Sequence, residues 1–273
     1  MDASILQQYE HWLREDEKAE KTVEKYLRDV KKFLAHIKEE TIIKERVISF
    51  KEELRKQYQP VSANSIIAAV NSFLGFLGLT ECRVKQYKIQ KKMYSNKELT
   101  KEEYIRLVET AGKKKNQRLS LVIQAMGGSG IRVSELAFIT VEAVRDGDVE
   151  VTLKNKTRTV FLPQNLKEPL LNYAKAEKIS SGPIFITKTG KTLNRSNIWK
   201  EMKSLCEEAK VDAGKVFPHN LRHLFARAFF GIEKDIVKLA DLLGHSNIET
   251  TRIYLIETGT YHEKIINQMG LIL

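Results

Sequence analysis

Cysteine is scarce in this sequence: Cys82 and Cys206 are the only two among 273 residues. Two cysteines cannot form a disulfide framework or a zinc site built on thiolates, so we expect both to be small core residues. A secretion signal is also lacking, because the first sixteen residues, MDASILQQYEHWLRED, carry acidic side chains where a signal peptide needs a basic region. These absences favour a cytoplasmic protein.

The sequence also has no stretch with the pattern of a membrane span. Residues 57–80 carry no charge, but serines and asparagines interrupt them at helical spacing. The opposite face of this stretch is apolar and consists of Ile66, Ile67, Val70, Phe73, Leu74 and Leu77. The pattern predicts an amphipathic helix rather than a membrane span, so we expect no membrane partner.

Motifs for several catalytic classes are missing. There is no GxxxxGK[ST] loop for nucleotide hydrolysis and no HExxH or HxxEH pattern for zinc. A nuclease that uses two metal ions needs several converging carboxylates. The only close pair of aspartates, Asp146 and Asp148, is explained by a turn between a helix and a strand. We therefore expect neither a metal ion nor a cofactor.

Positive charge, in contrast, is abundant and uneven. The 46 lysines and arginines exceed the 35 acidic residues by 11. Residues 51–100 carry nine basic and four acidic side chains, and residues 151–200 carry ten and two. Two separated basic stretches suggest two surfaces that grip one polyanion, which favours nucleic acid as a partner. The alternative from charge alone is a basic protein without such a partner.

Apolar periodicity predicts a helical bundle over residues 1–82. Apolar residues recur at helical spacing in three stripes, which are Ile5, Tyr9, Trp12 and Leu13; then Tyr26, Leu27, Val30, Phe33, Leu34 and Ile37; then the face from Ile66 to Leu77. Residues 83–97 are polar and basic without a sustained period, as in a linker. This linker is either a strap that closes around DNA or a solvated connector.

A second domain is predicted over residues 98–273, where Thr100 and Glu103 form a capping box at a helix start. Its one β pattern alternates from Val149 to Leu153, turns over residues 154–158 and returns over residues 159–162. The fold class is therefore mainly α with a small antiparallel hairpin. The C-terminal tail, residues 261–273, is apolar along one side and either docks into a neighbouring copy or packs on its own domain.

Three stretches of this domain carry residue types that bind phosphate. The first is a glycine-rich turn followed by Arg132, and the second places His219 and Arg222 on one helix face. In the third, His245 lies in a turn after Gly244 and precedes Tyr254 by nine residues. Ser246 and Glu249 form a second capping box, which is predicted to begin the helix that carries Tyr254. Taken singly, each has an ordinary explanation, such as an ion pair between Arg132 and Glu135 or a basic helix face.

Taken together, these stretches resemble the tyrosine recombinase family, also called the phage-type integrases. Gly130-Ile-Arg132-Val-Ser-Glu135-Leu136 is similar to the first arginine box of the family, and His219-Asn-Leu-Arg222-His223 to its HxxR box. Leu243-Gly-His245 followed by Thr250-Thr-Arg-Ile-Tyr254 is similar to the box of the nucleophile. The boxes occur in the family's order, and the N-terminal bundle is similar to its core-binding domain.

The resemblance implies a function and a role for each residue. The chain would clamp double-stranded DNA and assemble as a homotetramer on paired recombination sites, with an accessory DNA-bending factor as a further partner. Tyr254 would attack a phosphodiester and form a 3′-phosphotyrosyl link, while Arg132 and Arg222 hold the non-bridging oxygens. His219 would be a general base or phosphate ligand, and His245 would bind the same phosphate. Neither ATP nor a metal is implied.

The family pattern also implies a hairpin lysine that protonates the leaving 5′-oxygen. The family reads close to K-G-x-K-x-R, whereas this chain reads Lys154-Asn-Lys156-Thr-Arg158, one residue shorter. We choose Lys154 because it ends a strand, whereas Lys156 is predicted in the turn, but the pattern leaves both open. A type IB topoisomerase and a catalytically silent DNA-binding regulator are the alternative functions.

The residues after Tyr254 favour one branch of the family. Leu255-Ile-Glu257 replaces the Y-T-H continuation common among Xer recombinases. This departure favours the integrase of a mobile element, and the resemblance then implies a bacterial protein associated with the nucleoid.

Overall fold

A computed structural model describes residues 3–38, 40–89, 98–153, 156–187, 189–252, 254 and 267–269. The chain divides into two compact units, Met1–Lys91 and Lys92–Leu273. No helix within the described ranges is long and apolar enough to cross a membrane.

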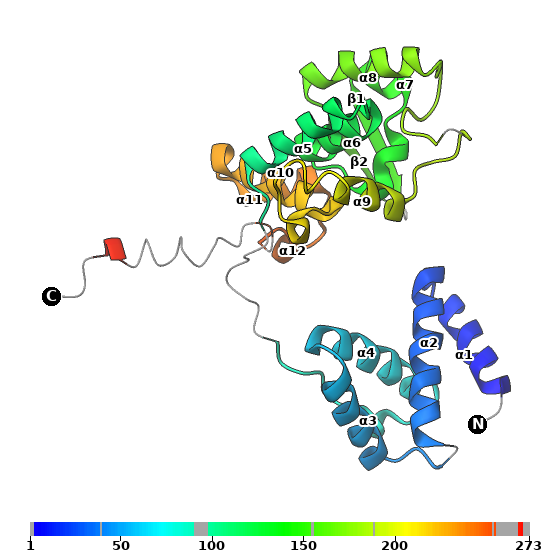
Figure 1. The fold of residues 1–273 in the computed structure, drawn as a ribbon. Coiled ribbons are helices and arrows are strands. Elements are labelled where there is room, and N and C mark those ends of the chain that lie inside the picture. The colour runs from blue at the N-terminus through cyan, green and yellow to red at the C-terminus, as the bar shows by residue number, and fades with distance from the viewer. Residues whose placement is uncertain are drawn as a thin grey trace. The chain divides into compact units, whose positions relative to one another are not determined.

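The first unit is a bundle of four helices (Figure 1). These are α1 (Ala3–Glu15), α2 (Glu20–Ile37), α3 (Lys44–Gln57) and α4 (Pro60–Phe76), followed by a 3₁₀ turn, η1 (Thr80–Cys82). Pro60 begins α4, where its missing N–H costs no helical hydrogen bond. The predicted apolar stripes form the core, with Tyr9, Phe33 and Phe73 fully buried. The prediction of a helical bundle is therefore confirmed.

Two asparagines of α4 hold the chain that follows the bundle. The Asn71 amide accepts from the Val84 N–H at 3.0 Å and donates to the Val84 carbonyl at 2.8 Å. Asn64 makes the same pair of bonds with Tyr87, at 2.7 and 2.9 Å. The first part of the basic segment is thus fixed on the first unit, while residues 90–97 lie outside the described residues.

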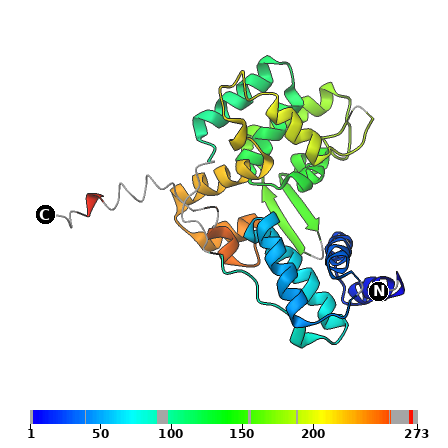
Figure 2. The same ribbon diagram turned by 60° about the horizontal axis from the view of Figure 1, so that its bottom comes forward.

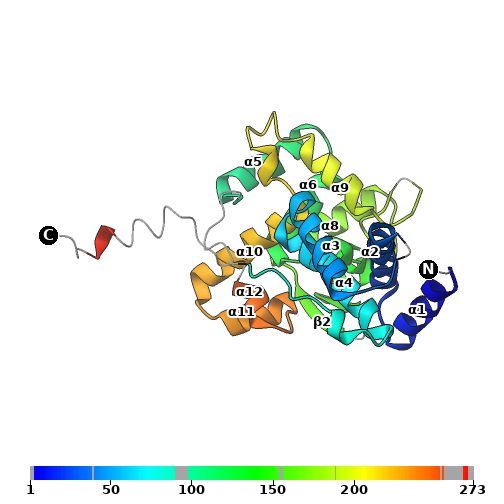
Figure 3. The same cartoon turned by 90° about the horizontal axis from the view of Figure 1, so that it is seen from below.

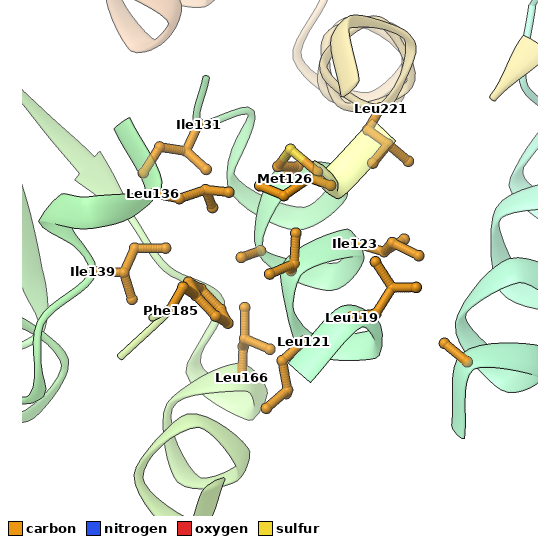
Figure 4. Packing of buried hydrophobic residues seen from close by; sticks show 14 of the residues in the cluster. Leu119, Leu121, Ile123, Met126, Ile131, Leu136, Ile139, Leu166, Phe185 and Leu221 are labelled. Carbon is orange, nitrogen blue, oxygen red and sulfur yellow. The ribbon is translucent and has the colours of Figure 1, made fainter. Parts of the chain in front are cut away.

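The second unit is also mainly helical. In chain order its elements are α5 (Lys101–Lys113), α6 (Gln117–Ser129), η2 (Val133–Phe138), α7 (Val141–Asp146), β1 (Asp148–Leu153), β2 (Lys156–Phe161), α8 (Gln164–Ala176), α9 (Arg195–Lys203), η3 (Ala213–Lys215), α10 (Pro218–Glu233), α11 (Ile236–Leu243) and α12 (Ile248–Arg252). The predicted capping box of Thr100 and Glu103 begins α5. Figure 4 shows the core, which includes Leu221 of α10 and Met126 of α6.

The strands β1 and β2 pair as an antiparallel hairpin, the two neighbouring arrows of Figure 2. The register pairs Val149 with Val160 and Leu153 with Lys156. Our prediction that the turn spans residues 154–158 is therefore wrong, because β2 already begins at Lys156. The polar residues from Lys156 to Arg158 resemble a turn in sequence, but they belong to the ladder, in which Arg158 lies opposite Val151 and is held by Glu135 and the Leu242 carbonyl.

The glycine-rich stretch before Arg132 also differs from our prediction. Gly127 and Gly128 lie inside α6, and only Gly130 turns the chain, with φ of 65°. A Cβ at Gly127 would lie 2.6 Å from the Tyr104 ring, so this glycine permits close packing against α5. Cys82 and Cys206 are free and buried, as we predicted.

Candidate active site

The candidate site forms around α10, α11 and α12, which lie side by side in Figures 1 and 3. Pro218 begins α10 as predicted, so that His219 and Arg222 lie one turn apart. The helix α11 ends at Gly244 with φ of 62°, and this left-handed residue turns the chain directly into His245. The same turn leads to α12 and then to Tyr254.

The start of α12 corrects one detail of our prediction. The side chain of Asn247, not Ser246, caps this helix by accepting from the Glu249 N–H at 2.8 Å. The helix also ends at Arg252, so Tyr254 follows it rather than lying within it. The side chain of Thr251, which is fully buried, bonds to His245 and so connects this helix to the turn.

Arg222 is the most deeply buried cation of the site, with 1 % of the residue exposed. Its guanidinium donates to the carbonyls of Gly130 and Leu243 and contacts Nε2 of His245 at 3.1 Å. Burial and the charge of Arg132 lower its pKa to about 10, so it stays protonated at neutral pH. Its Nε is buried without a hydrogen-bond partner among the described residues.

Arg132 shares the Leu243 carbonyl with Arg222 but lies in a more exposed position. Its Nη1 lies 2.7 Å from Oε1 of Glu135, and its Nη2 donates to the Leu243 carbonyl at 3.1 Å. The ion pair with Glu135 that its sequence spacing allows is thus present. Glu135 is 2 % exposed; burial alone would raise its pKa, but hydrogen bonds from Arg132 and the charges of Arg158 and Arg132 lower it.

Two imidazoles complete the polar part of the site. His245 is held from both sides, with Nδ1 at 2.9 Å from Oγ1 of Thr251 and Nε2 toward Arg222. Desolvation and the charges of Arg222 and Arg132 lower its pKa to about 4, so the ring is neutral at physiological pH. Desolvation and Arg222 also lower the pKa of His219. Neutral imidazoles can accept a proton or donate a hydrogen bond.

Tyr254 is buried, with 4 % exposed, among three histidine rings. Its ring centroid lies 5.3 Å from that of His219, 4.3 Å from that of His223 and 5.3 Å from that of His245. Tyr254 raises the pKa of Arg222 and so offsets part of the lowering by burial and Arg132, which places the phenol near the buried guanidinium. The tyrosine is therefore surrounded by groups that can take its proton and stabilise its oxyanion.

The structure thus brings together five of the six predicted residues, namely Arg132, His219, Arg222, His245 and Tyr254. Lys154 lies outside the described residues, and the choice between Lys154 and Lys156 stays a prediction. The reason given for preferring Lys154 does not hold, because β1 ends at Leu153 and Lys156 lies in β2 rather than in the turn. Our sequence reasoning did not assign Glu135, Arg158 or His223 to the site. The sequence did offer a signal for each of them. Glu135 and His223 lie within two of the family-like boxes, and Arg158 is the arginine of the hairpin pattern.

This cluster is suited to bind an anion. Two guanidinium groups and two imidazoles meet here, and guanidinium donors form their strongest hydrogen bonds with oxyanions such as phosphate. Within the described ranges, no three His, Cys, Asp or Glu side chains are arranged to hold a metal ion.

Comparison with known proteins shows the family of this chain. Residues 97–258 match the phage integrase family, and residues 6–79 match the N-terminal SAM-like domain of phage integrases. The chain belongs to the phage integrase family. Tyrosine recombinase XerA of Pyrococcus furiosus is 29 % identical over 99 % of this chain and 95 % of its own length. Tyrosine recombinase XerD of Staphylococcus haemolyticus is also 29 % identical, over 97 % and 98 %.

Solved structures share the fold of this integrase-family chain. A dimer of lambda integrase residues 75–356 bound to a COC′ core site matches with a TM-score of 0.73 and 18 % identity, over 92 % of this chain and 94 % of that one. The Tn1549 transposon integrase in complex with transposon right-end DNA matches with a TM-score of 0.70 and 14 % identity, over 98 % and 99 %. The mainly helical fold with one hairpin is thereby confirmed.

Proposed function

We propose that this chain is a site-specific tyrosine recombinase that cleaves and rejoins strands of double-stranded DNA. The observation that carries the proposal is the buried Arg222, whose Nε lacks a partner among the described residues beside the buried Tyr254. A scissile phosphate would supply the missing acceptor. Family membership, on both the catalytic and the N-terminal part, supports the same function.

The chemical step is an in-line displacement at phosphorus. The Tyr254 oxygen forms a bond to phosphorus, and the bond from phosphorus to the 5′-oxygen breaks, which leaves a 3′-phosphotyrosyl link. The phenol proton passes to His219, the neutral imidazole near the Tyr254 ring. The leaving 5′-oxygen takes a proton from the hairpin lysine, for which we keep Lys154. Attack by a 5′-hydroxyl on the phosphotyrosine reverses these steps and rejoins the strand.

Electrostatic stabilisation supplies most of the rate in this scheme. Arg132 and Arg222 place two guanidinium groups beside one phosphate, and His245 adds a hydrogen bond. Their positions are fixed before the phosphate arrives, because each is bonded to backbone carbonyls or to a buried partner. Fixed donors lose little energy to reorganisation in the transition state.

The partners we propose follow from the relatives. Lambda integrase has been solved as a dimer on a core site and as a tetramer on a Holliday junction. We propose that this chain likewise acts as a homotetramer on paired sites, with an accessory DNA-bending factor, in the bacterial cytoplasm at the nucleoid. Both Xer recombinases and a transposon integrase are among its relatives, and we keep the mobile-element role as a proposal. The tail that would dock between copies lies almost wholly outside the described residues.

Covalent capture tests this function. Nicked DNA fragments from the flanks of the gene's own locus are incubated in EDTA with the wild-type protein and with Tyr254→Phe. We expect an SDS-resistant adduct with the wild type only, while both proteins bind the DNA equally. Binding without any adduct would indicate a silent DNA-binding protein. Relaxation of supercoiled DNA without sequence preference would instead support a topoisomerase.

A further inference from the structure

Arg158 is a third guanidinium at the site, and the proposed chemistry does not use it. It lies on β2, with 13 % of its side chain exposed. Its Nη2 lies 2.6 Å from Oε2 of Glu135, and its Nη1 donates to the Leu242 carbonyl at 2.7 Å. Both ends of the guanidinium fork are therefore engaged by acceptors of the protein itself.

Each of these acceptors leads to a group that would touch the phosphate. The Glu135 carboxylate accepts two hydrogen bonds from Arg132, one from Nη1 of Arg132 at 2.7 Å and one from the Arg132 backbone N–H at 2.9 Å. Leu242 lies in the last turn of α11, and the next carbonyl, that of Leu243, receives Arg132 and Arg222. The end of α11 then leads through Gly244 to His245. Arg158 thus ties Arg132 and the turn of His245 to the hairpin.

Gly244 shows how closely the turn approaches this side chain. A Cβ at Gly244 would lie 2.3 Å from Cδ of Arg158, which no relaxed structure allows. The φ of 62° already favours glycine here, and the contact with Arg158 adds a second requirement. The turn before His245 is therefore packed directly on the aliphatic part of Arg158.

We propose that Arg158 is a positioning residue, which acts on the scissile phosphate through Arg132 and His245 without contacting it. This proposal rests on the proposed recombinase function. The fork shape is essential, because one guanidinium spans a carboxylate and a carbonyl on different elements. A lysine keeps the charge, but its three donors share one nitrogen, so it does not reproduce the spacing at which Nη1 and Nη2 of Arg158 meet the carbonyl and the carboxylate.

Single-turnover cleavage of the nicked DNA compares Arg158→Lys, Arg158→Met and a matched control, Arg118→Met. Arg118 makes the same type of contacts elsewhere in the unit, with Glu201 at 3.0 Å and with the Ile186 carbonyl at 3.4 Å. We expect both Arg158 variants to slow cleavage about 10²-fold with unchanged DNA affinity, the loss typical of a misplaced catalytic group. The control keeps the wild-type rate. Full activity of Arg158→Lys would overturn the proposal, because charge alone would then suffice.

Modified substrates reveal which group Arg158 acts on. A methylphosphonate at the scissile position removes the negative charge that Arg132 stabilises, so the deficit of Arg158→Met should shrink with this substrate, as should that of Arg132→Met. A 5′-bridging phosphorothioate, which has a better leaving group, should leave the deficit unchanged. Rescue by the phosphorothioate alone would overturn the proposal, because Arg158 would then act through the hairpin lysine.

Sulfate binding without DNA separates this proposal from the proposed function. Inorganic sulfate is titrated against the full chain, and the ring signals of His245 and His219 are followed by NMR. We expect Arg158→Met and Arg158→Lys to weaken sulfate binding, whereas Arg118→Met leaves it unchanged. If the wild type binds sulfate but forms no adduct, the recombinase function fails while the positioning role stands. Equal sulfate affinity of wild type and both Arg158 variants would overturn the positioning role.

Discussion

Each of the two units buries charged side chains, but they do so in different ways. In the first unit, Asp29 is 1 % exposed and pairs with Lys25 at 2.7 Å and Arg28 at 3.3 Å. All three belong to α2, and both cations reach solvent. A pair of this kind forms with the helix itself and implies nothing about function.

In the second unit, the buried Glu135 and Arg222 belong to a cluster that joins distant segments. The contacts of Arg222 and Arg158 join residues 92 and 84 positions apart in sequence. Moreover, Nε of Arg222 is buried without a partner among the described residues. Folding alone does not require such a costly arrangement, whereas a phosphate bound beside Arg222 would offer it an acceptor. Convergence and missing acceptors, rather than burial itself, distinguish a functional cluster from a structural pair.

The largest expected effect is on catalysis at Arg222. We expect Arg222→Met to lower the single-turnover cleavage rate by about 10²–10³-fold, as for the loss of one oxyanion donor. Because the variant also removes a buried charge that lacks a full set of acceptors, its stability should fall little. Urea unfolding and cleavage are measured on the same preparation. A large loss of stability with normal cleavage would show that Arg222 has a structural role and not a catalytic one.

Removal of the buried carboxylates compares the two units directly. We expect Glu135→Gln to reduce the free energy of unfolding by about 3–5 kcal/mol, because Arg158 keeps its charge in a mostly buried position. Asp29→Asn should cost about 1 kcal/mol, since Lys25 and Arg28 are solvated once released. Urea titrations of both variants measure this difference. Equal costs would show that the two buried carboxylates are equivalent.

A pair of glycine substitutions isolates the contact with Arg158. Gly244 and Gly190 both have positive φ, 62° and 77°, so alanine costs of order 1 kcal/mol or more at either position. Only at Gly244 does the new Cβ displace Arg158, since nothing lies within 4 Å of it at Gly190. We expect Gly244→Ala to slow cleavage tens of fold, and Gly190→Ala to cleave at the wild-type rate. Equal cleavage rates would show that this packing does not matter for the reaction.

The last expected effect is the pH dependence of stability. Burial and neighbouring cations lower the pKa of His223 to about 3 and that of His245 to about 4. Between about pH 6.5 and 4 the unfolded chain binds protons that the folded chain does not, so acid favours unfolding. Each histidine should reduce the free energy of unfolding by up to about 1.4 kcal/mol per pH unit in this window.

Urea unfolding at pH 7 and pH 5 tests this effect. His223→Phe keeps a ring but cannot titrate, so we expect a smaller difference between the two pH values than in the wild type. The same difference in both proteins would mean that His223 is protonated in the folded state.

Local signals in the sequence account for most of what could be predicted. The capping box at Thr100, Pro218 at the start of α10 and Gly244 after α11 each act within one turn of helix, so they mark boundaries reliably. The prediction of the hairpin turn was wrong because residues 156–158 are all polar and so lack the alternation of apolar and polar residues that marks a strand. The prediction that Ser246 caps α12 was wrong because adjacent serine and asparagine compete for the same role, and Asn247 takes it.

The supporting shell of the site could not be predicted in the same way. Glu135 has an ordinary partner at i−3, Arg132, which fully explains its position in sequence. Its second partner, Arg158, comes from another element and depends on how β2 packs on the end of α11. The boxes identified the residues that we propose to face the phosphate, but only tertiary packing identifies those that hold them.

The most direct test of the account locates the covalent link. The adduct formed on nicked DNA in EDTA is digested with trypsin and nuclease, and the peptide that carries the residual nucleotide is sequenced by mass spectrometry. We predict a single modified residue, Tyr254, among the nine tyrosines of the chain. A nucleotide on any other residue, or an adduct that persists in Tyr254→Phe, would contradict the assignment of the buried cationic cluster as the site of strand cleavage.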